Sequence, residues 1–161
     1  MELLTKKRNN GWGLIQYPSI ILYFSPPISS AIMNTNQLAQ LIMRIGLGIN
    51  MLMHGLVRIP KLSAFVAKTG AGFANTIMPV LLTKAFLYTL PFVELTSGIL
   101  ILLGGQFSKW GYFVGGLTIG ALLLGTTLKE DWASAGTQMI YVIAFYLALR
   151  GLDSSGRGRF R

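Results

Sequence analysis

One carboxylate of this chain lies where a charge needs an explanation. Glu94 stands within the stretch "PFVELTSG" (residues 91–98), between two apolar runs. A charge in apolar surroundings is costly, and such residues usually pair with one another or face a polar interior. Arg44, in "LIMRIGLG", is the candidate partner in the preceding apolar segment. The planar fork of an arginine is well suited to a carboxylate.

The two residues also match in depth. The first two apolar segments run antiparallel, with midpoints near Gly48 and Val93. At 1.5 Å per residue, Arg44 and Glu94 lie on the same side of the midplane, about 4 to 5 Å apart in depth. Gly48 shares a helix face with Arg44, and Gly98 shares one with Glu94. Small residues let two helices approach closely, so we predict an Arg44–Glu94 ion pair between these segments.

Two further polar residues follow Arg44 along the same segment. Asn50 and His54 lie to one side of the Arg44 face, where they can line the same polar interior. Two interpretations of this group are open. The ion pair either fixes the register of two helices or takes part in proton handling or ligand binding. His54 is likewise either a hydrogen-bonded residue near a helix end or a ligand-binding group.

Composition indicates the class of protein that must position these residues. The chain has 161 residues, of which 52% are hydrophobic and 12% charged, and its mean hydropathy is +0.56. Soluble domains carry about 25% charged residues. The absence of cysteine excludes disulfides and thiolate metal sites, and the single histidine excludes a two-histidine haem site, so we predict no metal centre. The net charge of +9 does not indicate nucleic-acid binding, because the basic residues flank apolar segments without interleaved aromatics.

The apolar segments predict an all-α membrane protein. About 20 mostly apolar residues span a bilayer as a helix. Four segments meet this criterion and predict a four-helix transmembrane bundle within a domain of residues 33–153: Leu38–Val57, Leu82–Leu103, Trp110–Leu128 and Ala133–Leu149. Glycines at four-residue spacing in the third segment indicate close helix packing.

The connection of residues 59–79 is longer than the other turns. One apolar face, interrupted at Gly70 and Gly72, is formed by Leu62, Phe65, Val66, Phe73 and Ile77. This pattern predicts a short interfacial helix between the first two spans. An ordered loop is the alternative.

The termini are basic. Residues 1–32 resemble a signal peptide in part, but Gln16 and Pro18 interrupt the apolar run, so we expect a poorly ordered extension with Met33 as an alternative start. Residues 154–161 form a basic tail. An even number of spans puts both termini on one side. The basic residues near them predict cytoplasmic termini in a bacterial inner membrane.

The order of these motifs resembles the DoxX family of small four-helix membrane proteins. The similarity lies in "LIMRIGLGINMLMHGLVRIPKL" and "LPFVELTSGILILLGGQFSKWGYFVGG". Arg44, His54-Gly55 and Lys61 correspond to the family's first-helix pattern. Pro91, Glu94 and Gly98 correspond to its second-helix pattern, and the resemblance covers about residues 38–153.

The resemblance implies a role beside membrane oxidoreductases. The family takes its name from a subunit linked to archaeal terminal quinol oxidase and thiosulfate:quinone oxidoreductase. We therefore expect an accessory subunit of a quinone-linked redox complex, which binds lipid and other membrane subunits and is not an enzyme by itself. Arg44, His54 and Glu94 would polarise or protonate a quinone, on which Tyr88 or Phe92 would pack. A non-catalytic assembly subunit is the alternative, and a small-solute transporter has weaker support.

Overall fold

The computed structural model describes residues 33–156, with side chains for 33–152. Residues 1–32 and 157–161 lie outside the described part, so the predicted N-terminal extension and most of the predicted basic tail cannot be compared with it. Within residues 33–156 the chain is helical and contains no strand. The elements are α1 (Thr35–Arg58), the 3₁₀ turn η2 (Ile59–Lys61), α2 (Leu62–Ala71), α3 (Val80–Leu103), α4 (Gly105–Leu128) and α5 (Trp132–Gly156).

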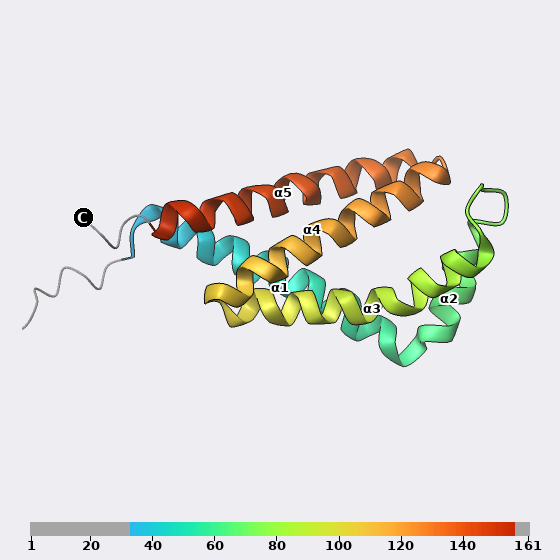
Figure 1. Cartoon of the computed structure of the whole chain (residues 1–161), viewed down its shortest axis with the longest axis horizontal. Helices are drawn as coiled ribbons and strands as arrows, with labels where there is room; N and C mark the ends of the chain where they lie inside the picture. Colours follow the sequence, from blue (N-terminus) through green and yellow to red (C-terminus); the bar gives the residue numbers. More distant parts are fainter. Residues whose placement is uncertain (1–32, 157–161) are drawn as a thin grey trace, which may run out of the picture. The chain divides into compact units, whose positions relative to one another are not determined.

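The predicted four-helix architecture is confirmed. Four helical segments of the described residues are long and apolar enough to cross a membrane: Thr35–Ala71, Val80–Leu103, Gly105–Leu128 and Trp132–Leu152. They pack as an antiparallel bundle in which each of α3, α4 and α5 returns along its predecessor (Figure 1). The chain is an integral membrane protein.

Residues 62–71 of the connection form a helix, as the first of the two alternatives predicted, but this helix continues the apolar span Thr35–Ala71 instead of forming a separate interfacial segment. After α1 the chain turns through η2, which contains Pro60, and continues as α2. Proline cannot donate its backbone hydrogen bond and interrupts a helix. In Figure 1, α2 follows α1 along the N-terminal half of α3. Val66 of α2 is buried there in a cluster with Leu87 and Leu90 of α3.

Polar side chains define the starts of α1 and α5. Asn34 and Gln37 form a reciprocal capping box, in which each side chain accepts a hydrogen bond from the other residue's backbone N–H. Asp131 precedes α5 and accepts a hydrogen bond from the backbone N–H of Ser134 at 3.1 Å. Hydrogen bonds from the Ser134 side chain and backbone hold the pKa of Asp131 below its usual value. These caps fix where both helices begin.

Hydrogen bonds between helices hold α3 against α4. The buried Ser97 hydroxyl donates to the carbonyl of Gly111 at 2.8 Å, and the buried Ser108 hydroxyl donates to the carbonyl of Ile101 at 3.0 Å. A Cβ atom at Gly111 would lie 2.7 Å from the backbone nitrogen of Ile101. The glycine therefore lets the two backbones approach closely enough for the serines to bond across the interface.

Glycines also set the register of α1 against α3. A Cβ atom at Gly55 would lie 2.6 Å from the backbone nitrogen of Leu95, and one at Gly98 would lie 2.7 Å from the Cα of Leu52. A Cβ atom at Gly48 would lie 2.7 Å from side-chain carbons of Leu102. No larger residue fits at Gly55 or Gly98 without moving a backbone, whereas a larger residue at Gly48 would displace the Leu102 side chain. The first two positions therefore determine which turns of α1 and α3 are in contact.

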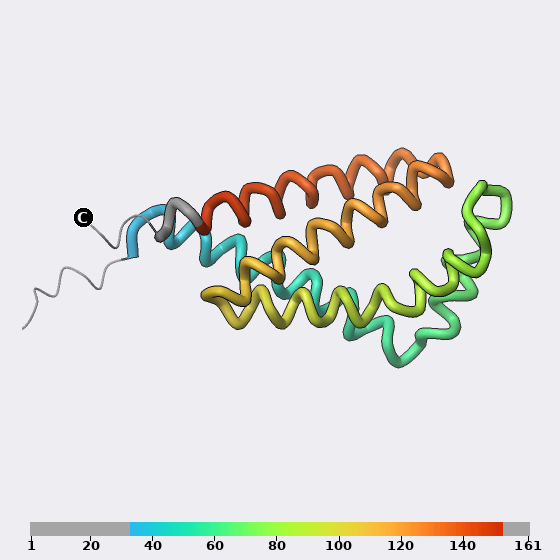
Figure 2. Tube along the Cα trace, in the orientation of Figure 1, coloured from blue at the N-terminus to red at the C-terminus, as the bar shows by residue number. Residues whose placement is uncertain are grey.

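This register differs from the one that equal midpoints predict. Equal midpoints put Gly48 level with Val93, but Gly48 packs against Ile101 and Leu102, eight or nine residues further along α3. At 1.5 Å per residue the difference is about 12 Å. The start of α1 therefore projects beyond the α3–α4 turn (Figure 2). Leu152 of α5 and Gln40 of α1 line one cavity at this end.

We predict that Gly55→Ala and Gly98→Ala destabilise the protein by about 1 to 3 kcal/mol, because the added methyl group overpacks a backbone contact. Gly46→Ala and Gly136→Ala are the controls, since a Cβ atom at either position meets nothing within 4 Å. These controls should be neutral or stabilising, because alanine favours helix over glycine. Thermal midpoints in detergent measure the effect. Equal thermal midpoints for the two packed variants (Gly55→Ala, Gly98→Ala) and the two control variants would contradict this register of α1 against α3.

Candidate functional site

The buried carboxylate of α3 pairs with Arg58, not with Arg44. Nη1 of Arg58 donates to both carboxylate oxygens of Glu94, at 2.5 Å each. The Glu94 side chain is 3% exposed and that of Arg58 is 24% exposed. This is the one salt bridge among residues 33–152. The predicted Arg44–Glu94 pair is therefore wrong in its arginine, although an ion pair between the first two spans is present.

The register of α1 against α3 explains why Arg58, and not Arg44, pairs with Glu94. Arg44, Gly48, Met51, Gly55 and Arg58 all follow one face of α1, so both arginines point towards α3. They are 14 residues apart, which corresponds to about 21 Å along the helix. The glycine contacts put Arg58 level with the middle of α3. Arg44 lies at the end of α3, where its Nη1 would be 2.6 Å from a Cβ atom on Gly104.

The ion pair lies near the middle of a membrane span. Glu94 is within three residues of the centre of α3, or about 4 Å along the axis. The Arg58 guanidinium also lies over the ring of Phe65 in α2, 4.9 Å from its centroid. A carboxylate on one side and an aromatic face on the other thus stabilise the arginine at the break between α1 and α2.

The pair borders a cavity of about 350 Å³ between α1, α3, α4 and α5, which we call the polar cavity. Its lining residues combine hydrogen-bonding groups with apolar walls: Asn50, Met51, His54, Arg58, Glu94, Ile119, Leu122, Ser134, Thr137, Gln138 and Tyr141. A cavity of this kind, apolar with a few convergent polar groups, is typical of a small-molecule site.

Hydrogen bonds orient several of these side chains. The Asn50 amide donates to the Tyr141 hydroxyl at 3.3 Å, which joins α1 to α5. The Thr126 hydroxyl donates to Oε1 of Gln138 at 2.7 Å. Because the Gln138 oxygen is the acceptor of that bond, its amide nitrogen remains as a donor for the cavity. Hydrogen bonds from α1 and α4 therefore fix two α5 side chains, Tyr141 and Gln138, beside the ion pair.

The polar cavity adjoins a second, more open space on the outer face of α1. Asn50, His54 and Arg58 line both. The remaining walls of this outer groove are Ile49, Met53 and Val57, and its volume is about 460 Å³. All six residues of this outer groove belong to α1, so it is an open surface of one helix on which the apolar side chains adjoin the polar ones. His54 stands at the junction.

The structure brings together most of the predicted polar residues. Asn50, His54 and Glu94 line the polar cavity, whereas Arg44 lies about 21 Å along α1 from Arg58. Tyr88 and Phe92, expected to pack on a ligand, are not among its lining residues. Both are nearly half exposed, at 46% and 47%.

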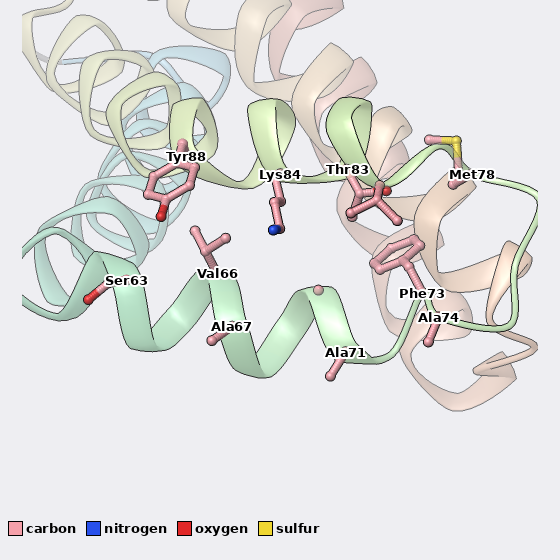
Figure 3. A pocket seen from close by; sticks show the side chains of 12 residues that line it. Ser63, Val66, Ala67, Ala71, Phe73, Ala74, Met78, Thr83, Lys84 and Tyr88 are labelled. Atoms are coloured by element: carbon pink, nitrogen blue, oxygen red, sulfur yellow. The ribbon is translucent and has the colours of Figure 1, made fainter.

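Tyr88 instead lines an apolar cavity of about 410 Å³ between α2 and α3 (Figure 3). Val66 and Ala67 of α2 form its floor, and the Lys84 side chain of α3 points towards them. Tyr88 thus belongs to the contact between the second half of the first span and α3, away from the ion pair.

Sequence reasoning missed Arg58, Gln138 and Tyr141. Arg58 is one turn beyond Gly55 on the face already identified, so the glycine spacing contained the signal. Gln138 and Tyr141 are three residues apart and therefore share a face of α5. Nothing local shows that this face meets α1. That information comes from the packing of distant helices.

No family model, curated protein or solved structure matches this chain. The site must therefore be interpreted from its own chemistry. Within residues 33–152, no three side chains of histidine, cysteine, aspartate or glutamate gather as a metal site.

We predict that Arg58→Met and Glu94→Gln each destabilise the protein by about 3 to 5 kcal/mol, because each strands a buried charge or polar group. The double variant should be more stable than the worse single variant, since no ion is left unpaired. A double-mutant cycle of thermal midpoints in detergent measures the coupling. The matched control pairs Arg44→Met with Glu94→Gln, whose effects should add. Additive losses for Arg58 and Glu94 would contradict the pairing.

Proposed function

We propose that the chain is a quinone-binding accessory subunit of a membrane redox complex, similar in role to DoxX-family proteins. The supporting observation is the polar cavity beside the Arg58–Glu94 pair, near the middle of α3 and connected to an apolar outer groove. A membrane quinone combines a polar head group with an apolar tail. Its two parts correspond to the two connected spaces.

The head group fits the donors of the polar cavity. A quinone ring has two carbonyl oxygens that accept hydrogen bonds. The amide nitrogen of Gln138 and the hydroxyl of Tyr141 lie on α5, across from Arg58 on α1. Met51, Ile119 and Leu122 supply apolar walls for the ring, in the place expected of Tyr88 and Phe92. Polar groups from opposite helices can thus hold both ends of a planar head group.

The tail fits the outer groove. Ile49, Met53 and Val57 are the apolar residues of this groove, on the outer face of α1. Ile49 is 50% exposed and Val57 47% exposed, as expected for side chains that face lipid. A ligand that enters from the bilayer would pass His54 before its head group reaches Glu94. A small water-soluble solute would gain nothing from an apolar approach of this kind.

Two titratable groups border the route. Reduction of a quinone to a quinol takes up two electrons and two protons. His54 and Glu94 are groups that exchange protons. The chain has no cysteine, and residues 33–152 hold no metal-ligand cluster, so we assign the electron-transfer centre to a partner subunit. In this proposal the chain supplies the binding pocket and the proton path.

Basic residues near both termini, Lys6-Lys7-Arg8 and Arg157, Arg159 and Arg161, support cytoplasmic termini in a bacterial inner membrane. Arg44 lies at the end of the bundle that holds the α3–α4 turn and the end of α5. Lys109 and Arg150 are at this same end. The opposite end carries Lys68, Lys84 and Lys129, so the basic residues of the bundle itself are balanced between the two ends and the proposal rests on the terminal clusters. Basic residues gather on the cytoplasmic side of membrane proteins.

A non-catalytic assembly subunit is the second candidate, and open glycine faces favour it. A Cβ atom at Gly120 of α4 or Gly136 of α5 would meet nothing within 4 Å. Small residues exposed on spanning helices are typical contact points for another membrane helix. The two candidates differ in whether the polar cavity has a ligand.

We predict that the full-length protein in lipid nanodiscs binds a benzoquinone with a short isoprenoid tail. Gln138→Leu and Tyr141→Phe should each weaken binding about tenfold, the effect of one lost hydrogen bond to the ligand. Tyr146→Phe is the matched control, because Tyr146 is exposed on α5 and, among the described residues, its hydroxyl accepts a hydrogen bond from Arg150 alone.

Titration followed by quantification of bound quinone measures the affinity. A wild-type protein that binds no quinone would contradict the quinone proposal. If a stoichiometric partner protein also copurifies from the native membrane, the assembly role is favoured. Equal binding by the wild type and both cavity variants would place the quinone elsewhere.

A further inference from the structure

Arg44 belongs to a second cavity, at the end of the bundle. It lies beside the α3–α4 turn and has a volume of about 180 Å³, and we call it the turn cavity. Its residues are contributed by α1, α4 and α5: Met33, Gln37, Gln40, Leu41, Arg44, Gly105, Ser108, Tyr112 and Leu152. None of them lines the polar cavity.

Among residues 33–152, no acidic side chain pairs with the Arg44 guanidinium. The single salt bridge of residues 33–152 engages Arg58, and the arginine stacked on an aromatic ring there is also Arg58. Arg44 is half-buried and lies against Gly104. A guanidinium presents five N–H donors, and here none has an acidic partner among the described residues.

A helix N-terminus adds further donors. The 24-residue helix α4 begins at Gly105, and no side chain caps its first turn. The first backbone N–H groups of a helix lack intrahelical partners and form the positive end of its dipole. Gly105 itself lines the turn cavity. Uncapped N–H groups and a guanidinium thus border one space, an arrangement that suits a phosphate or carboxylate.

Two polar side chains of the same cavity have groups without a hydrogen-bond partner among the described residues. Tyr112 is 1% exposed and lines the cavity, yet its hydroxyl has no hydrogen bond within residues 33–152. Oε1 of Gln40 is buried and also lacks a hydrogen-bond partner. Buried polar groups are almost always hydrogen-bonded. The hydroxyl can donate to an anion, whereas the amide oxygen requires a donor on the ligand.

We propose that the turn cavity binds the phosphodiester of an anionic membrane lipid whose head group carries a hydroxyl, as in a glycerol-type phospholipid. Arg44, the first N–H groups of α4 and the Tyr112 hydroxyl hold the phosphate oxygens. Oε1 of Gln40 accepts from the head-group hydroxyl. Each unpartnered group that lines the cavity acquires a complementary partner from this one ligand.

The turn cavity lies at the level of the lipid head groups in the membrane. Gly104 and Gly105 both have positive φ angles, 81° and 58°, so the turn has an irregular backbone. Irregular backbone exposed to lipid lies outside the hydrocarbon core. Arg44 beside this turn is therefore at head-group level. Lys109 and Arg150 at the same end add the positive field that attracts anionic lipids.

The test uses the full-length protein in a neutral detergent, with thermal midpoints recorded as lipid is added. Phosphatidylglycerol should stabilise the wild type saturably, with an apparent affinity about tenfold or more above that of phosphatidylcholine. Arg44→Gln should weaken this affinity about tenfold, because a charge-assisted bond is lost. Tyr112→Phe keeps the ring that packs on Phe145 and should weaken it about threefold to tenfold.

Lys109→Gln is the charge-matched control, since Lys109 is exposed at the same end of the bundle and does not line the cavity. The affinity of Lys109→Gln for phosphatidylglycerol should stay within about twofold of that of the wild type. An equal loss for Lys109→Gln and Arg44→Gln would show diffuse attraction and overturn the site. Inorganic phosphate that stabilises as well as the lipid would assign the cavity to a free anion. Wild-type affinity in both Arg44→Gln and Tyr112→Phe would also overturn it.

Discussion

The ion pair between Arg58 and Glu94 is the contact on which the arrangement of this bundle depends. A carboxylate near the middle of a spanning helix needs a cation at the same depth, and Arg58 reaches it from the last turn of α1. Glycines make that possible, because Gly55 and Gly98 bring α1 and α3 together beside the pair. Close packing and charge neutralisation therefore fix the same register.

The break after α1 follows from this register. Because α1 ends level with the middle of α3, the N-terminal half of α3 needs another helix to cover it. The helix α2 supplies it, with Val66 buried against Leu87 and Leu90. The break in turn places Phe65 over the Arg58 guanidinium. One interrupted helix thus covers α3 and completes the surroundings of the charged pair.

The fold could be predicted from the sequence, but the charged pair could not be assigned correctly. Four long apolar runs define four helices, because a chain in lipid must satisfy its own backbone hydrogen bonds. The choice between Arg44 and Arg58 depends on how far α1 is shifted along α3. The shift is about 12 Å from the position in which the centres of the two helices are level, and the sequence does not indicate it. The glycines of α1 and α3 were recognised as contact points without being matched to each other. Gln138 and Tyr141 needed the packing of α5 on α1, which no local pattern reveals.

The two arginines of α1 share one uninterrupted hydrogen-bonded helix, Thr35–Arg58. Such a helix behaves as a nearly rigid rod, so a sliding motion at one end is transmitted in full to the other. A shift of one residue, about 1.5 Å, would move the Arg44 guanidinium relative to the membrane surface and the Arg58 guanidinium relative to Glu94 by the same amount. The thickness of the surrounding bilayer and the geometry of the buried charge are therefore mechanically linked through this helix.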